Sequence, residues 1–309
     1  MPEPSFTVPP DLLADLNIRH TPDAPLGALT WYRTGGNAAI LASPSNAAQL
    51  SELTALCREK RVPMLILGAG ANLLVRDEGV DAVVVRLDDP NFKQIAIDQK
   101  SGVVTAGAGV DLFKLVPASA RAGLEGLVHV AGIPATIGGA VRMNAGGAFG
   151  DIGESVKRVQ VMSDAGQVYY RDQDDLEFGY RRTNIAAPFI LEVEFALSPD
   201  DPVDLMKRYK EIYLHKKNSQ PMGDKSAGCC FKNPPAEAGA TAGQLIDRSG
   251  LKGFSVGGAS VSEVHANFVV AEPSKTTSSD VLKVIEHVEQ TVETRHGVRL
   301  ERELIVWPA

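Results

Sequence analysis

The stretch "SAGCCFKNPP", residues 226–235, places two adjacent cysteines between a glycine and a run with a lysine and an asparagine. A cysteine pair in such a place could be a redox couple, a metal site, a catalytic acid or a part of the fold without chemistry. A metal site needs further Cys or His ligands at recognisable spacing, and the sequence offers no such set. A disulfide between neighbouring residues is strained. Two interpretations remain: proton transfer by one thiol, or two buried structural thiols.

Glycine-rich stretches form a second candidate site. They are "RTGG" at 33–36, "GAGANL" at 68–73, and residues 132–153 with seven glycines. The second begins like a dinucleotide fingerprint, but Leu73 stands where its last glycine belongs, which argues against a Rossmann unit. Gly68 and Gly70 let backbone amides approach a ligand closely, and Asn72 tolerates a left-handed conformation. Together the stretches favour loops around the phosphates of a large cofactor over simple tight turns.

Composition limits the kinds of partner. The 309 residues carry a formal net charge of −7, with 44% hydrophobic and 22% charged residues, as in an ordinary globular protein. A net negative charge does not favour binding to nucleic acid or to an anionic membrane. The N-terminus lacks a signal-peptide pattern and no apolar run is long enough to cross a bilayer, so we expect a cytoplasmic protein. Three cysteines make no disulfide framework.

The elements that must position these residues indicate an α+β protein. We expect a surface segment over 1–30, a strand–helix–strand lobe over 31–92, a second α+β lobe over 93–198 and a third domain over 203–309. The clearest helix lies within "SSDVLKVIEHVEQTVETRHG" and ends at Gly297. Its apolar stripe consists of Val281, Leu282, Ile285, Val288 and Val292. The final stretch "VRLERELIVW" predicts a strand that carries Glu303.

Seven stretches, taken in order, resemble the UDP-N-acetylenolpyruvoylglucosamine reductase family. They are "RTGGNA", "LGAGANLLV", "GIPATIGGAVRMNAGG", "YRRTN", "SAGCCFKNP", "AGQLIDRSGLKG" and "GGASVSEVHANFVV". Each is weak alone, but the ordered set is specific and covers nearly the whole chain. The chain resembles the shorter class of the family, which lacks a tyrosine-bearing insertion in the third lobe.

The resemblance implies a two-lobed FAD-binding domain of the vanillyl-alcohol-oxidase (PCMH) type, followed by a C-terminal α+β domain for a UDP-sugar. It also implies non-covalent FAD, NADPH as the reductant, and a cytoplasmic step of peptidoglycan synthesis. The reaction reduces an enolpyruvyl ether of UDP-N-acetylglucosamine to UDP-N-acetylmuramate. We expect a monomer that binds a small-molecule UDP-sugar and neither nucleic acid nor membrane.

The family's site residues map onto this chain motif by motif. Arg181 and Glu303 match the residues that stabilise the enolate, and Arg181 suits the task because its fork can hold a carboxylate. We expect the substrate to contact Tyr180, Lys217, Gln220, Lys232 and Asn233. We expect FAD to contact Arg33, Thr34, Gly35, Gly68, Gly70, Asn72, Leu73, Gly132, Pro134, Ile137, Gly138, Gly139, Asn144 and Gly146.

The cysteine pair departs from the family pattern. The family has Ser-x-Gly-Ser-x-Phe, and its second serine donates a proton; "SAGCCF" places Cys229 at that position. A thiol has a pKa of about 8.5, far below that of an aliphatic alcohol, so it is a competent neutral acid. An apolar setting would keep it protonated until it acts. Cys230 and Ser226 are the other candidates for the donor.

Two other functions are open at this point. An alcohol oxidase of the same superfamily would often hold FAD covalently, and the "SAGCCFKNP" and "HANFVV" stretches count against it. A nucleotide-binding regulatory protein that kept the fold without catalysis would explain the Cys229 departure. Arg181 and Glu303 argue against that loss of function.

Overall fold

The computed structural model describes residues 7–308. Contacts divide the chain into two compact units. Unit 1 comprises the residues up to Ala24, Ala39–Ala69 and Asp81–His215, and unit 2 comprises Pro25–Ala38, Gly70–Val80 and the chain from Lys216 onward. Each unit has its own hydrophobic core. The predicted first lobe, 31–92, contributes to both units, and the three predicted domain boundaries stay a prediction.

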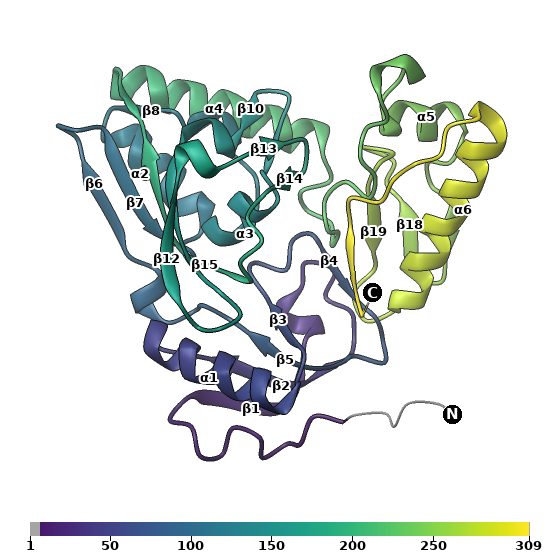
Figure 1. The fold of residues 1–309 in the computed structure, drawn as a ribbon. Coiled ribbons are helices and arrows are strands. Elements are labelled where there is room, and N and C mark those ends of the chain that lie inside the picture. Colours follow the sequence, from purple (N-terminus) through teal and green to yellow (C-terminus); the bar gives the residue numbers. More distant parts are fainter. Residues whose placement is uncertain (1–6, 309) are drawn as a thin grey trace. The chain divides into compact units, whose positions relative to one another are not determined.

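A four-stranded sheet in the order β1-β2-β5-β3 begins the fold (Figure 1). Its strands are β1 (Arg19–Pro25), β2 (Asn37–Ser43), β5 (Val80–Val85) and β3 (Met64–Ile66). Helix α1 (Ala47–Lys60) starts where Asn46 accepts the Gln49 N–H, and it buries Leu50, Leu53 and Cys57. Helix α1 lies between β2 and β3 along the chain, as in the predicted strand–helix–strand unit, and β3 runs parallel to β5.

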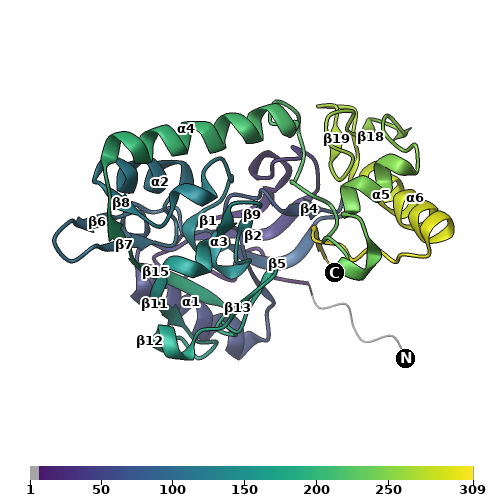
Figure 2. The ribbon, with the colours of Figure 1, turned by 90° about the horizontal axis from the view of Figure 1, so that it is seen from above.

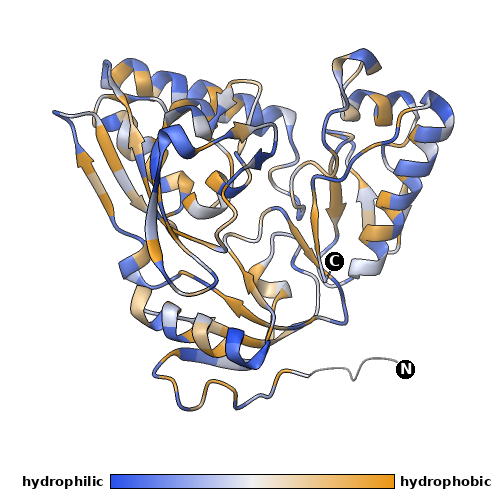
Figure 3. Cartoon of the chain, in the orientation of Figure 1, coloured by the Kyte–Doolittle hydropathy of each residue, from blue (hydrophilic) through white to orange (hydrophobic). Residues whose placement is uncertain are grey.

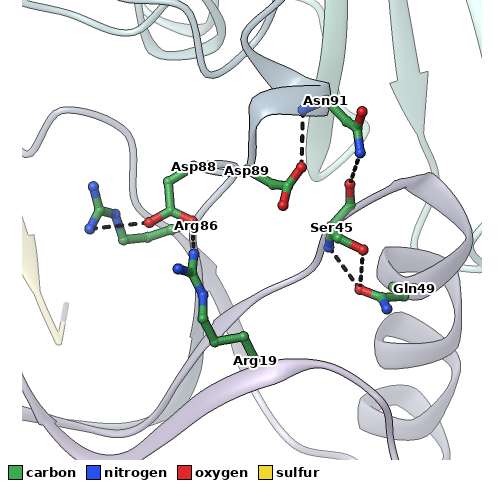
Figure 4. Close-up of polar contacts among 7 residues, drawn as sticks. All are labelled: Arg19, Ser45, Gln49, Arg86, Asp88, Asp89 and Asn91. Carbon is green, nitrogen blue, oxygen red and sulfur yellow. Dashed lines mark hydrogen bonds and ion pairs between the residues drawn. The ribbon is translucent and has the colours of Figure 1, made fainter.

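Polar contacts tie the loop after β5 to the first strand and the first helix (Figure 4). The Asp88 carboxylate lies 2.8 Å from the Arg19 guanidinium and 3.6 Å from that of Arg86. The Asn91 amide donates to the Ser45 carbonyl over 3.0 Å. These contacts hold residues 86–92 against α1 and lead the chain into the second sheet of unit 1.

The second sheet of unit 1 has the order β12-β11-β15-β7-β6 and is antiparallel. Its strands are β6 (Ile95–Asp98), β7 (Val103–Gly107), β11 (Val156–Met162), β12 (Val168–Asp172) and β15 (Phe189–Ala196). Helices α2 (Leu112–Arg121) and α3 (Ile137–Arg142) lie in the same unit, and α3 contacts β15 and β7. The buried residues of these elements form one continuous core.

Helix α4 (Pro202–Ser219) packs along α2, as Figures 1 and 2 both show. Leu205 contacts Ala120 and Val128 there. Short strands complete the unit: β8 (Leu124–Glu125), β9 (Gly146–Gly147), β10 (Gly150–Asp151), β13 (Phe178–Gly179), β14 (Arg182–Thr183) and β16 (Ser198–Pro199). None of the helices in the described residues is both long and apolar enough to cross a membrane.

Unit 2 is built on a small antiparallel sheet and one long helix. The sheet consists of β17 (Ser255–Val256), β18 (Ala259–Val261) and β19 (Val269–Ala271). Helix α6 (Ser278–His296) contacts all three strands, and α5 (Ala242–Arg248) packs on α6. All five residues of the predicted stripe on α6 are buried, and Gly297 ends the helix at a φ of 66°. The hydrophilic outer side of α6 is visible in Figure 3.

The N-terminal part differs from its predicted role in one respect. Strand β1 lies within the predicted surface segment 1–30, and Leu13 and Val8 are buried in the core of unit 1. The sequence "RHTPDAP" of β1 does not alternate in polarity, so the strand gave no periodic signal. It lies at the edge of its sheet, where a strand needs little apolar surface.

Candidate active site

The two cysteines lie on a short segment of unit 2 that bends at Cys230 and is hydrogen-bonded on both sides. On one side, the Glu303 N–H donates to the Cys230 carbonyl over 2.8 Å. On the other, Cys229 forms an antiparallel bridge with Phe268, and the Cys230 N–H donates to the Asn267 carbonyl over 2.8 Å. Backbone hydrogen bonds therefore hold Glu303 beside the cysteine pair, so two of the three predicted catalytic residues, Cys229 and Glu303, lie on neighbouring segments.

Burial separates the three candidate proton donors. Cys229 is half-buried, whereas Cys230 is 1% exposed and Ser226 is 5% exposed. The Cys230 thiol lies 3.9 Å from the hydroxyl of buried Tyr32. Burial raises the pKa of Cys230 to about 11, and the nearby Glu303 charge adds a smaller upward effect. A substrate that reaches this segment can therefore meet Cys229 before it meets Cys230 or Ser226.

Glu303 is half-buried and held through its backbone. Its carbonyl accepts the Asn72 side-chain amide over 3.1 Å, and the Ile305 N–H donates to the Asn72 carbonyl. Strand β20 (Ile305–Trp307) then runs parallel to β4 (Leu73–Val75). The strand is shorter than predicted, because the backbone at 301–303 pairs with the cysteine segment instead.

The first two glycine stretches meet within unit 2. Gly35 has a φ of 119°, and a Cβ built there would lie 2.6 Å from the Val75 carbonyl oxygen, so only glycine fits. Gly70 has a φ of 65°, and its carbonyl accepts the Trp31 N–H over 3.0 Å. Thr34 donates its hydroxyl proton to the Thr276 carbonyl over 2.9 Å. The loop at 33–36 and residues Gly70–Leu73 thus form one packed group.

The predicted substrate residues of unit 2 are at or near the surface. The Lys232 ammonium lies 2.6 Å from the Glu301 carboxylate, which neutralises part of its charge. Asn233 is exposed, and its side-chain oxygen accepts the Ala242 N–H over 3.1 Å. Lys217 is exposed in the last turn of α4, and Gln220 follows at the end of that helix.

Arg181 occupies a tight turn of unit 1 between β13 and β14. It is a non-glycine residue with a φ of 55°, a conformation that costs roughly 1–2 kcal/mol for most residues. Its guanidinium donates to the Gly146 carbonyl over 2.9 Å, lies 4.0 Å from Asp151, and lies over the Tyr180 ring. The side chain is 15% exposed. A cationic fork is thus fixed beside the third glycine stretch.

Asn144 connects that glycine stretch to the Arg181 turn. Its side-chain amide donates to the Gly179 carbonyl, and its side-chain oxygen accepts the Gly153 N–H, each over 3.0 Å. Asn144 has a φ of 43° and is 3% exposed. Both ends of its side chain are used within the protein, so its role in this unit is to hold the two loops together.

The rest of the third stretch packs against the β3 loop of unit 1. A Cβ on Gly68 would lie 2.7 Å from the Thr136 hydroxyl, and a Cβ on Gly138 would lie 2.9 Å from the Ala108 Cβ. Thr136 caps α3 by accepting the Gly139 N–H. Ile137 is buried, Pro134 is half-buried, and Gly132 has a φ of 79°.

The residues present suit a dinucleotide cofactor with a flat ring system. Gly68 lies so close to the Thr136 hydroxyl that a side chain at residue 68 is excluded. Ile66, just before that loop, is 37% exposed although it ends an apolar strand. Backbone amides and exposed apolar surface are the contacts that phosphates and an isoalloxazine ring use.

Sequence reasoning missed Asn267 and Tyr32, which contact the cysteine segment, and Asp151, which lies beside Arg181. Asn267 stands in the stretch "HANF", and an asparagine just before a strand is a residue type that often bonds to nearby backbone. Nothing in the sequence around Tyr32 or Asp151 marked either residue.

Comparison with known proteins decides the family. A model of the C-terminal domain of UDP-N-acetylenolpyruvoylglucosamine reductase matches residues 220–307, and a model of an FAD binding domain matches residues 38–170. The UDP-N-acetylenolpyruvoylglucosamine reductase of Desulfosudis oleivorans is 40% identical over 92% of this chain and 93% of its own length. The chain belongs to the UDP-N-acetylenolpyruvoylglucosamine reductases.

Other reductases of the family agree with that assignment. Reductase 2 of Symbiobacterium thermophilum is 39% identical over 92% of this chain and 90% of its own length. The crystal structure of the Thermus caldophilus reductase (MurB) superposes with a TM-score of 0.78 at 35% identity and covers 95% of this chain and 100% of that one. The predicted α+β fold, the FAD cofactor and the oxidoreductase class are confirmed.

Proposed function

We propose that this chain uses NADPH to reduce the enolpyruvyl ether of UDP-N-acetylglucosamine to UDP-N-acetylmuramate, as a cytoplasmic monomer in peptidoglycan synthesis. FAD, when bound, would supply the two-electron hydride chemistry that links NADPH to the vinyl carbon. The loops at 33–36, 68–73 and 132–146 would hold it. The observation that carries the proposal is the pairing of Glu303 with the cysteine segment in a chain of this family.

Three side chains divide the work on the substrate. Hydride addition to the vinyl carbon forms a C–H bond and moves the electron pair of the double bond toward the substrate carboxylate, as an enolate. The Arg181 guanidinium stabilises that negative charge, and Glu303 adds to this as the protonated acid, by donating a hydrogen bond. The Cys229 thiol then donates its proton to the adjacent carbon, and the thiolate recovers a proton from solvent because Cys229 is half-buried. Tyr180, Lys217, Gln220, Lys232 and Asn233 hold the UDP-sugar.

A thiol suits this role for two reasons. Its ordinary pKa lies well below that of serine, so the proton leaves more readily. The thiol must also be neutral when the substrate binds, and the neighbouring residues Phe231 and Phe268 supply apolar surface. Replacement of the family's serine by Cys229 is thus compatible with the same acid step.

An anaerobic visible spectrum tests the proposal. The purified yellow protein should bleach with NADPH and regain its colour when UDP-N-acetylenolpyruvoylglucosamine is added. The Arg181→Ala variant should bleach at the parent rate and recolour roughly 100-fold more slowly or worse, because one charge-stabilising group is lost. Arg182→Ala, at the exposed neighbouring position, is the matched control. A parent protein that bleaches but never recolours would refute this substrate.

A further inference from the structure

Asn267 makes three hydrogen bonds to the cysteine segment. It lies in the loop between β18 and β19 and is 4% exposed. Its side-chain oxygen accepts the Phe231 N–H over 3.0 Å, and its side-chain amide donates to the Phe231 carbonyl over 2.8 Å. Its own carbonyl accepts the Cys230 N–H. One residue thus satisfies both backbone groups of Phe231 and one of Cys230.

The contacts on the opposite side of the segment come from the C-terminal stretch. The Cys230 carbonyl accepts the Glu303 N–H, and the Lys232 N–H donates to the Glu301 carbonyl. The segment is therefore clamped between Asn267 and residues 301–303 of the C-terminal stretch. Asn267 is itself held by a turn, in which the Phe268 N–H donates to the His265 carbonyl.

Adjacent cysteines create an ambiguity that such a clamp resolves. A one-residue slip would put Cys230 in the place of Cys229, a thiol for a thiol, and would bring Phe231 into the place of Cys230. The half-buried position therefore accepts either thiol, and the register depends on Phe231. The buried Phe231 side chain and the two hydrogen bonds that Asn267 makes to the Phe231 backbone oppose the same slip.

We propose that Asn267 is a positioning residue that sets the register of the cysteine segment, so that Cys229 faces the substrate and Cys230 stays buried. This inference rests on the proposed function for the meaning of Cys229, but the register itself is a property of the folded chain. The contact between the Cys230 thiol and the Tyr32 hydroxyl supports the same register from the buried side.

The register can be read by mapping which thiols react. The folded protein is treated with iodoacetamide at pH 7.5 and digested with trypsin. Cleavage after Lys225 and Lys232 gives one peptide, residues 226–232, with both cysteines, and its fragment masses assign the label to one or the other. In the parent, the label should enter Cys229, because Cys230 and Cys57 are buried.

In Asn267→Ala, labelling of Cys230 relative to Cys229 should rise at least tenfold. Asn267→Asp keeps the size and the acceptor for the Phe231 N–H but cannot donate to the Phe231 carbonyl, so a smaller rise is expected. Thr277→Ala is the control: it removes the N-cap of α6 and weakens the same unit without contacting the cysteine segment. Its labelling should match that of the parent.

A second readout separates positioning from general damage. In Asn267→Ala, recolouring by the UDP-sugar should slow by roughly 100-fold, as for a misplaced reacting group, while bleaching by NADPH keeps the parent rate. Unchanged labelling of Cys230 in both folded Asn267 variants would overturn the proposal, as would failure of both to fold. If the parent never recolours, the proposed function fails, and the labelling still tests the register.

Discussion

Replacing Asn144 with alanine tests how the turn of Arg181 is held. Asn144 bridges Gly153 and Gly179 through both ends of its side chain. Gly179 precedes Arg181 by two residues. It also adopts a left-handed backbone conformation, with a φ of 43°. Alanine removes both hydrogen bonds and places a less tolerant residue in that conformation.

The size of the effect follows from these contacts. Each lost hydrogen bond contributes about 1 kcal/mol, and the two partners, on half-buried glycines, are partly hydrated afterwards. The left-handed conformation adds about 1 kcal/mol for alanine relative to asparagine or glycine. The unfolding free energy should therefore fall by about 3 kcal/mol for Asn144→Ala and by about 2 kcal/mol for Asn144→Gly. For a unit of this size, 1 kcal/mol corresponds to about 2–4 °C in Tm.

Thermal unfolding followed by far-UV circular dichroism measures the difference. Asn184→Ala is a matched control, because Asn184 also makes two side-chain hydrogen bonds to backbone, to Glu177 and Asp175, but at exposed positions. It should cost about 1 kcal/mol or less. If Asn144→Ala were no less stable than Asn184→Ala, or Asn144→Gly were less stable than Asn144→Ala, the account of this turn would be wrong.

Three further outcomes are expected. Cys229→Ser should recolour within about tenfold of the parent rate, whereas Cys229→Ala should recolour roughly 10²–10⁴-fold more slowly, as measured by stopped-flow absorbance. A Cys229→Ala protein that recolours as fast as the parent would exclude Cys229 as the acid. Burial raises the pKa of Cys57 to about 11 from 9.0. The stabilising contribution of the neutral thiol is therefore complete below pH 9, and the unfolding free energy falls by about 2–3 kcal/mol as the pH rises to 11. Urea unfolding at pH 8 and pH 10.5 should show a smaller loss of unfolding free energy in Cys57→Ala than in the parent. Gly35→Ala should lower the unfolding free energy by more than about 2 kcal/mol, whereas Gly147→Ala, where a Cβ meets no atom within 4 Å, should change it by about 0.5 kcal/mol or less; equal effects in urea unfolding would contradict the close approach at Gly35.

Periodic elements were predictable from the sequence, and elements shaped by distant contacts were not. Helix α6 showed its stripe and its terminal glycine, and both are as expected. Strand β1 was not predicted because its residues do not alternate between apolar and polar. Strand β20 is shorter than predicted because residues 301–303 pair with the cysteine segment. Pairing between residues far apart in the chain leaves no local pattern for sequence reasoning to detect.

The same limit applies to the candidate site. The motifs marked Arg181, Cys229 and Glu303, since each is a residue type suited to one chemical step. The asparagines that hold them had no such mark: Asn144 and Asn72 were expected to contact the cofactor, and Asn267 was not singled out. In the structure the side chains of all three bond to backbone.

An asparagine amide is well suited to this task for a physical reason. It carries an N–H donor and a carbonyl acceptor in the same planar geometry as a peptide group, so it can replace a missing strand neighbour where backbone pairing ends. Asn267 does so at Phe231, and Asn144 does so between Gly153 and Gly179. The backbones of the cysteine segment and of the Arg181 turn are therefore held by asparagine side chains, and the candidate thiol and guanidinium are positioned through the main chain that carries them.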